Sequence, residues 1–353
     1  MDSRKPRPSR VILGVLCALA ALVAAFFAVR AVGVALNRRT PPGGINEEMY
    51  VELNGSEQWV SIYGEDLDNP VLFYLHGGPG SATSMFDYAV TRRWADVYTV
   101  VTWDQRACGL SAGSGGENFS CEQLVSDGIA LTEFLCDYLD ADKITLLGHS
   151  WGSYLGCRMA LERPEYYECF IGTGQLVDMR ENERRLAAEA AKWAEGDAEG
   201  EALVAQLDPE HPDMEHYAAR NALMERYGYD MFASGRDYSL AAAVIFNPYY
   251  SLGDWVRYLT GGNTYTGLLL SDEFASLSLL GETRYEMPFF NIDGERDYQT
   301  NIDLAMEYFD SVEAPYKRLY IMEGMTHGLL EAESEEFSQI VHETAALRRS
   351  NER

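Results

Sequence analysis

The chain has 353 residues, 47% of them hydrophobic, and a formal net charge of −27 at pH 7. This length accommodates one large domain or two modest ones with a packed core. Residues 1–40 carry seven Lys or Arg and one acid, a net of +6, so residues 41–353 carry −33. A surface this acidic repels nucleic acid, serves solubility and attracts cationic small molecules.

The first forty residues predict a membrane anchor. Val11 to Val29 is a run of nineteen uncharged, mostly apolar residues, long enough as a helix to cross a hydrocarbon core of about 30 Å. The run is flanked by basic residues on both sides: Arg4, Lys5, Arg7 and Arg10, then Arg30, Arg38 and Arg39. The small excess before the run favours an inside N-terminus and an extracytoplasmic domain. A signal peptide cleaved near Gly33 or Ala35 is the alternative.

The segments that follow predict strands. Asn54-Gly55 lies between the runs Met49–Leu53 and Glu57–Tyr63 and indicates a hairpin, because both turn residues accept positive φ. Val71–Leu75 and Thr99–Trp103 are continuous apolar runs. Such runs are typical of strands that are buried on both faces.

Helices and strands then alternate. A helical period runs from Cys121 to Leu139, and Ser120 and Gln123 fit a capping box at its start. The segments after it read as strand, helix and strand: Ile144–Leu147, Trp151–Glu162 and Phe170–Thr173. This order predicts a mainly parallel sheet with helices on both faces.

The alternation stops near Gly174. Helical stretches follow at Glu181–Glu195 and Glu215–Arg226, and strand pattern returns at Pro288–Ile292 and Lys317–Met322. A last helix is expected from about Glu331 to Arg348. We therefore expect residues 1–40 to form the basic N-terminus and anchor, residues 45–174 and 286–349 the two parts of an α/β core, and residues 175–285 a helical cap.

The motif Gly148-His-Ser150-Trp-Gly152 lies at the junction of a predicted strand and a predicted helix. Small residues on both sides of a serine permit a sharp turn that holds the hydroxyl clear of the sheet. Ser150 is therefore the candidate nucleophile. Taken alone, the motif also fits a glycine-rich turn with a structural serine.

A serine nucleophile needs a general base, and the base needs an orienting acid. Asp297 and His327 each follow a predicted strand, in the chain order Ser, Asp, His that this architecture uses. We expect Ser150 to attack a carbonyl, His327 to carry the proton and Asp297 to orient the imidazole. Asp293 and Asp303 are the alternatives for the acid.

The other histidines are less suited to be the base. His149 adjoins the nucleophile and is expected to point away from the position of the base. The remaining four are predicted in a glycine-rich loop, in the insertion and in the last helix: His76, His211, His216 and His342.

Two backbone amides should face the charge that develops on the carbonyl oxygen. One is expected from Trp151, the residue after the nucleophile. The other is expected from Gly78, with Gly77 as the runner-up, in the loop His76-Gly-Gly-Pro-Gly80. This loop lacks the Lys-Ser/Thr ending of a phosphate-binding loop.

Three motifs together resemble the proline iminopeptidase family of α/β-hydrolases: His76–Gly80, Trp103–Ser111 and Gly148–Ser153. The similarity covers about residues 45–174 and 286–330, and the insertion matches in position and helical character. The resemblance implies an α/β-hydrolase fold with a cap, and cleavage of an N-terminal residue, Pro or small, from peptides or aminoacyl amides through an acyl-enzyme. It implies no metal and no cofactor.

The resemblance also implies that carboxylates of the cap hold the free amino group of the substrate. Glu225, Asp254 and Glu273 are candidates by charge and region alone. Asp104-Gln-Arg106 is implied to be a structural segment at the edge of the pocket.

The sequence departs from the family pattern in places. Ala107 and Leu110 replace a Gly and an Arg, His149 stands where many members have Gly, and Tyr298 follows the acid where some have Glu. These departures leave amine specificity open. A carboxylesterase or lactonase on the same scaffold is the alternative function, and a non-catalytic membrane-anchored binding protein is a third. Ser at position 150 disfavours an aspartate-nucleophile dehalogenase or epoxide hydrolase.

Overall fold

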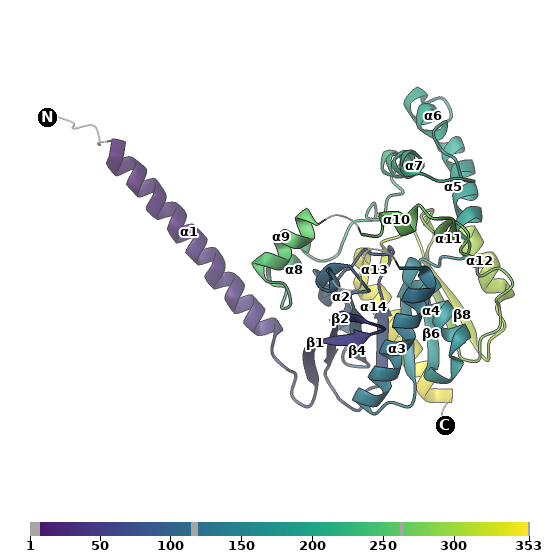
Figure 1. The fold of residues 1–353 in the computed structure, drawn as a ribbon, viewed down its shortest axis with the longest axis horizontal. Coiled ribbons are helices and arrows are strands. Elements are labelled where there is room, and N and C mark those ends of the chain that lie inside the picture. The colour runs from purple at the N-terminus through teal and green to yellow at the C-terminus, as the bar shows by residue number, and fades with distance from the viewer. Residues whose placement is uncertain (1–7, 114–118, 262–263, 352–353) are drawn as a thin grey trace.

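One eight-stranded sheet organises the chain (Figure 1) in the computed structural model, which describes residues 8–113, 119–261 and 264–351. Its strands are β1 (Ile45–Leu53), β2 (Ser56–Gly64), β3 (Val71–Leu75), β4 (Thr99–Trp103), β5 (Ile144–His149), β6 (Tyr167–Thr173), β7 (Phe289–Gly294) and β8 (Lys317–Met322). They lie in the order β1-β2-β4-β3-β5-β6-β7-β8. β1 and β2, and β2 and β4, are antiparallel, and the other neighbours are parallel. The expectation of a mainly parallel sheet is confirmed.

The predicted hairpin joins β1 to β2. Its turn residues Asn54 and Gly55 have φ of 47° and 79°, which is the left-handed conformation that a two-residue hairpin turn requires. Both strands are longer than predicted, and β1 starts at Ile45. No strand pattern marks this extension in the sequence because β1 is an edge strand, and Asn46, Glu47 and Glu48 in succession are polar and not buried.

Two apolar clusters hold helices to the two faces of the sheet. On one face, Phe73, Phe170 and Phe289 pack with α3 (Cys121–Leu139), α4 (Trp151–Glu162) and α12 (Ile302–Ser311). On the other, Leu72, Tyr74 and Ile171 pack with α14 (Ser334–Asn351) and with the 3₁₀ turn Arg92–Trp94, which follows α2 (Tyr88–Thr91).

Three helices differ from the expectation, one in its cap, one in its continuity and one in its presence. Ser120 Oγ accepts a 3.0 Å bond from the Gln123 amide, but the Gln123 side chain binds Asp127, so only half of the capping box forms. The last helix is divided at Glu333 into α13 (Leu329–Ala332) and α14. α12, which Asn301 caps, had not been predicted.

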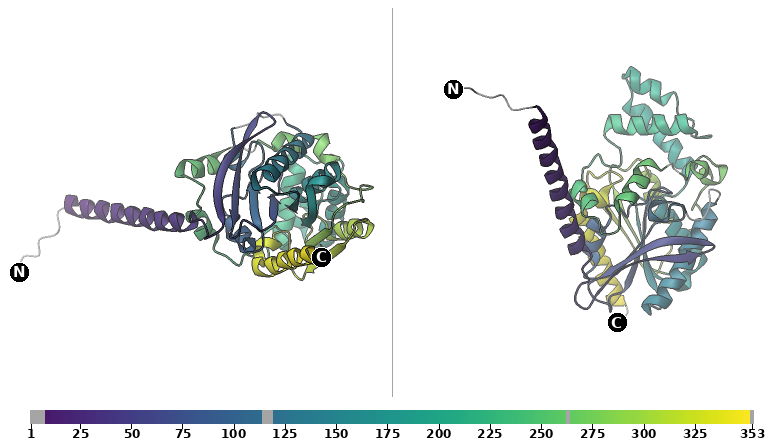
Figure 2. Two further views of the ribbon diagram at one scale, coloured as in Figure 1. Left: turned by 90° about the horizontal axis from the view of Figure 1, so that it is seen from below. Right: turned by 60° about the vertical axis from the view of Figure 1, so that its left-hand side comes forward.

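The insertion forms a helical cap over the carboxyl ends of the parallel strands (Figures 1 and 2). Its helices are α5 (Met179–Trp193), α6 (Ala198–Val204), α7 (Met214–Tyr227), α8 (Leu240–Ile245), α9 (Leu252–Thr260), α10 (Thr266–Leu269) and α11 (Asp272–Ala275). α5 begins at Met179 because Asp178 caps the Glu181 amide.

The predicted anchor lies in one long helix, α1 (Pro8–Asn37), which extends away from the domain (Figures 1 and 2). Residues Ile12–Asn37 are long and apolar enough to cross a membrane, and the domain buries none of the most apolar part. Exposure excludes a core helix and fits a span or a signal sequence. The flanking residues Arg4, Lys5 and Arg7 lie outside the described residues.

Candidate active site

Ser150 lies at a strained turn between β5 and α4. Its φ and ψ are 57° and −123°, a conformation that residues with a side chain rarely adopt. A Cβ on Gly148 would lie 2.2 Å from Gly152 O, and one on Gly152 would lie 2.0 Å from Leu75 O. The two glycines therefore permit the close approach of backbone that turns the serine out of the sheet.

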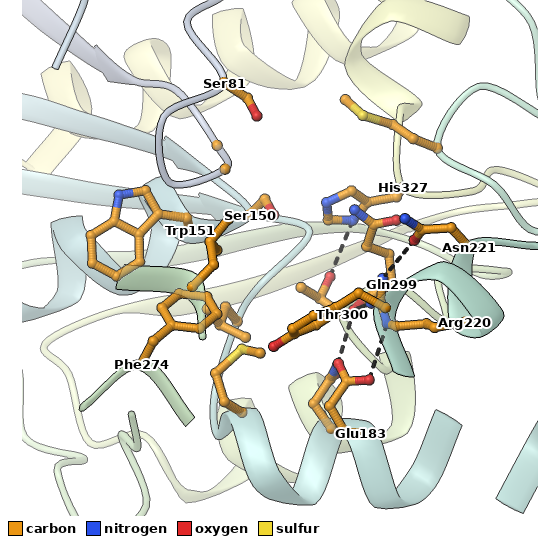
Figure 3. Close-up of a pocket in the computed structure, with 18 of the residues that line it drawn as sticks. Ser81, Ser150, Trp151, Glu183, Arg220, Asn221, Phe274, Gln299, Thr300 and His327 are labelled. Carbon is orange, nitrogen blue, oxygen red and sulfur yellow. Dashed lines mark hydrogen bonds and ion pairs between the residues drawn. The ribbon is translucent and has the colours of Figure 1, made fainter. Parts of the chain in front are cut away.

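His327 and Ser150 lie at the same pocket (Figure 3), and Asp297 contacts the ring of His327. His327 Nδ1 lies 2.7 Å from Asp297 Oδ2, and both side chains are buried. Asp297 also accepts bonds from the amides of Gln299 and Thr300 and from Thr300 Oγ1. His327 Nε2 has no partner among the described residues and borders the same pocket as Ser150. This nitrogen is thus available for a proton from the serine.

The alternative acids lie elsewhere. Asp293 accepts a 3.0 Å bond from the Gln175 amide, and burial raises the pKa of its carboxyl to about 7. Asp303 is exposed in the first turn of α12. Neither side chain contacts the ring of His327, so the geometry favours Asp297.

The expectation that His149 points away from the base is wrong. Its ring centre lies 4.7 Å from that of His327, and its Nε2 donates a 3.0 Å bond to the His327 carbonyl. The positive φ of Ser150 interrupts the alternation of the strand, so both neighbouring side chains reach the pocket. Burial and the adjacent His327 lower the pKa of His149 to about 3. His149 is a neutral support for the backbone of His327.

The loop after β3 faces the serine. Gly77, Gly78 and Trp151 all border the pocket, and a Cβ on Gly77 would lie 3.1 Å from Ser150 Cβ. Gln105 supports this loop: its Nε2 donates to His76 O, and its Oε1 accepts from Trp151 Nε1. Gly78 and Trp151 therefore both border the pocket that Ser150 faces, which is compatible with the prediction that their amides bind the oxyanion.

The neighbours of Gln105 are structural rather than part of the pocket. Arg106 forms a buried ion pair of 2.7 Å with Asp127, and Asp104 accepts bonds from Ser84 Oγ and the Leu110 amide. None of these side chains borders the pocket.

A pocket of about 390 Å³ lies between the serine and the cap. Its apolar wall consists of Leu176, Met179, Leu269, Leu270 and Phe274. Its polar wall comes from α5, α7 and the loop of Asp297, and contains Asn182, Glu183, Tyr217, Arg220, Asn221 and Gln299 (Figure 3).

Glu183 is a carboxylate on this polar wall that the sequence did not single out. It is buried, with Arg220 Nε and His216 Nε2 at 3.1 and 3.0 Å from its Oε2. Burial opposes the charged form, but Arg220 and His216 outweigh it, so the pKa of Glu183 lies below its usual value. Its other oxygen, Oε1, accepts one 3.3 Å bond from Asn182 among the described contacts.

The cap carboxylates proposed from the sequence lie away from this pocket. Glu225 is exposed on α7, and Asp254 completes a capping box with the N-cap Ser251 of α9 and pairs with Arg257. Glu273 accepts a bond from the Cys121 amide at the base of the cap. Charge and region cannot locate a carboxylate on one face of a helix. This limitation explains why these three were named and Glu183 was missed.

The described residues include no group of three or more His, Cys, Asp or Glu that could hold a metal ion. Tyr298, which follows the acid, makes edge-to-face contacts with the rings of Trp193 and Tyr229 and does not border the pocket.

Comparison with known proteins agrees with this architecture. A family model of the alpha/beta hydrolase fold matches residues 70–237. The probable aminopeptidase YbaC of Bacillus subtilis (strain 168) is 23% identical over 285 residues, 78% of this chain and 89% of YbaC. The proline iminopeptidase of Lactobacillus helveticus (strain DPC 4571) is 35% identical over 103 residues, 29% of this chain and 34% of that protein.

Among solved structures, a proline iminopeptidase-related protein from Thermus thermophilus superposes with a TM-score of 0.59 at 21% identity. The match covers 86% of this chain and 98% of that protein. The expected α/β-hydrolase fold is confirmed, and so is the resemblance to proline iminopeptidases.

Proposed function

Because the chain is a proline iminopeptidase-like protein of the α/β-hydrolase superfamily, we propose that it is a serine aminopeptidase. It removes an N-terminal residue, Pro or small, from peptides or aminoacyl amides. The observation that supports this most directly is the buried pair of His327 and Asp297 next to Ser150, in a pocket that also contains an ionised carboxylate.

The reaction follows from the arrangement of these groups. Ser150 Oγ attacks the scissile carbonyl while His327 Nε2 takes its proton, and Asp297 stabilises the imidazolium. The amides of Gly78 and Trp151 donate to the oxyanion. His327 then protonates the leaving amine, and an acyl-enzyme forms on Ser150. Water hydrolyses this ester with His327 again acting as the base.

Glu183 provides the site for the free amino group. Its Oε2 is occupied by Arg220 and His216, whereas Asn182 is the only described residue that donates to Oε1. A substrate ammonium group at Oε1 gains a charge-assisted bond inside a buried site. Arg220 and His216 keep Glu183 ionised in this buried position, so Oε1 carries the negative charge that the ammonium group requires.

A carboxylesterase or lactonase is the second candidate. The apolar wall formed by residues such as Met179, Leu269 and Phe274 favours this function, since it suits an acyl chain as well as a prolyl ring. The two functions differ in whether the substrate must carry a charged amine.

The test is a panel of Pro- and Ala-naphthylamides, free and N-acetylated, beside acyl p-nitrophenyl esters. We expect the free aminoacyl amides to be cleaved faster than their acetylated forms. Acetylation removes the charge that pairs with Glu183, at a cost of about 2–5 kcal/mol in transition-state binding. Equal rates on both forms, or activity on esters alone, would establish the esterase instead.

We also propose that α1 is an uncleaved single-span anchor, with its N-terminus inside and the domain outside the cytoplasm. The exposed apolar surface of Ile12–Asn37 and the basic residues at both of its ends support this topology.

A further inference from the structure

The helix α9 carries an apolar face that no described part of the domain covers. Leu252, Val256 and Leu259 follow the spacing i, i+4, i+7 and therefore lie on one side of the helix. Their exposed fractions are 45%, 60% and 78%. Large apolar side chains grouped in this way on an acidic, soluble domain indicate a contact surface.

This face adjoins α1. Figures 1 and 2 show α8 and α9 beside the C-terminal half of α1 in each view. The Arg30 guanidinium lies 4.9 Å from the ring centre of Trp255 on α9 and donates to the Tyr250 carbonyl. Trp255 is adjacent to Val256, so α9 sits at the level where the apolar run of α1 ends.

Further contacts fix this arrangement. Asn37 Nδ2 donates to the Phe246 carbonyl, and Arg38 Nε donates to the Pro248 carbonyl. A Cβ on Gly33 would lie 2.2 Å from the Phe246 ring, which shows how closely α1 packs on the segment before α9. The position of α9 is thus set relative to the end of α1.

The charges around this junction differ from those of the rest of the domain. The domain carries −33, yet five arginines lie at the junction where α1 meets α9 and the segments next to it: Arg30, Arg38, Arg39, Arg92 and Arg257. Glu48 pairs with Arg38 and Asp254 pairs with Arg257, so the junction keeps a surplus of basic groups. Basic and aromatic side chains at the end of an apolar helix are typical of the level of lipid headgroups. Both the charge and the position point to a lipid surface as the partner.

We propose that α9 is a membrane-contact helix, whose Leu252, Val256 and Leu259 enter the headgroup and acyl boundary of the bilayer that α1 spans. Three apolar residues on a nine-residue helix are a weak anchor by themselves. Because α1 already holds the helix at the membrane, its insertion is an intramolecular step at high effective concentration. This inference rests on the proposed span.

The contact has a consequence for the pocket. Tyr258 on α9 donates to the Ala82 carbonyl, and Tyr250 Oη lies 2.9 Å from Ser84 Oγ. Ser81 and Thr83 in the same loop border the pocket. The membrane contact therefore sets the height of this edge of the pocket above the lipid.

The test uses full-length protein reconstituted in phosphatidylcholine liposomes. In a Cys17→Ala/Cys136→Ala background, a fluorophore is attached to Val256→Cys and, as the control on the polar side of the same helix about 100° away, to Arg257→Cys. We expect lipids that carry a quencher in the acyl chains to quench the label at position 256 several-fold more than the label at 257, because the polar side of α9 stays at the level of the headgroups. Water-soluble iodide should show the reverse order.

Carbonate extraction of the same liposomes separates the two proposals. Protein that stays in the pellet while both labels respond equally to lipid quencher would overturn the role of α9 and leave the span intact. Release of the protein would contradict the span itself. A label at 256 that is protected from iodide without lipid quenching, and only at high protein-to-lipid ratio, would show a second copy of the chain on this face and would also overturn the proposal.

Discussion

At the residue scale, the proposed chemistry depends on Ser150, His327 and Asp297 acting as one unit. Asp297 accepts three hydrogen bonds from Gln299 and Thr300. These bonds hold its carboxylate so that Oδ2 faces His327 Nδ1. His149 supports the backbone of His327 from the other side. Each member of the unit is therefore positioned by residues outside it.

Removing two members of such a unit should cost little more than removing one. We expect Ser150→Ala and His327→Ala each to lower kcat by about 10⁴-fold or more, with the double variant close to either single variant. Steady-state kinetics on one aminoacyl amide measures this, and circular dichroism checks folding. A double variant many-fold slower than both single variants would show that the residues act independently.

The role of Glu183 can be separated from that of carboxylates elsewhere in the cap. Glu183→Gln should lower kcat/KM for free aminoacyl amides by about 30–100-fold, which corresponds to about 2–3 kcal/mol. The substitution should lower kcat/KM for N-acetylated or ester substrates far less. Glu225→Gln, an exposed change on α7, is the matched control. If both variants had the same ratio of free to acetylated rates, the amine would be bound elsewhere.

The ionised state of Glu183 should also be visible in the pH dependence of stability. The pKa of Glu183 is lowered from 4.5 in the folded state. Its contribution to stability is therefore complete above pH 4.5 and is lost as the pH falls through the lower, folded value. In urea titrations the free energy of unfolding of the unmodified protein should exceed that of Glu183→Gln by an amount that shrinks below pH 4.5. A difference that stays constant with pH would contradict an ionised Glu183 paired with Arg220.

At the scale of elements, the nucleophile turn depends on contacts between backbones. Gly152→Ala would place a methyl group against the carbonyl of Leu75, and neither partner can rotate away. We expect a loss of about 3 kcal/mol in the free energy of unfolding. Gly267→Ala on α10 meets nothing within 4 Å and should change stability by about 0.5 kcal/mol or less. Similar midpoints of urea unfolding for the two variants would show that the turn relaxes.

At the scale of the whole molecule, α1 should determine where the protein is found, and the charge of the domain should determine how fast substrates arrive. The full-length protein should remain in the membrane fraction after carbonate or high-salt extraction, because an apolar helix of this length partitions into the bilayer. External protease should digest the domain in intact cells. A shorter soluble species that begins near Val34 or Leu36 would show a cleaved signal instead.

The net charge of −33 on residues 41–353 should speed the arrival of cationic substrates. We expect kcat/KM for free aminoacyl amides to fall as ionic strength rises, since salt screens this attraction. The N-acetylated forms, which lack the charge, provide the control. Parallel salt curves for the two substrates would exclude electrostatic steering.

Local patterns were enough to predict much of this protein. The buried strands, the glycines around Ser150 and the long apolar helix are each encoded within a few neighbouring residues. Asp297 and His327 were found because each follows a strand that such a local pattern predicts. Strand and turn propensities, and the length of an apolar run, act over such short distances. These features could therefore be read without a fold.

Long-range packing decided the rest. The three candidate acids are distinguished by which one contacts the ring of His327, and the side chain of His149 is turned toward the pocket by the backbone conformation of Ser150. Glu183, rather than Glu225, Asp254 or Glu273, faces the serine because of how α5 and α7 pack over the sheet. The sequence by itself determined which chemical groups are present and in what local geometry. Only the tertiary structure decided which of them meet, because the faces that helices turn to one another depend on contacts between residues far apart in the chain.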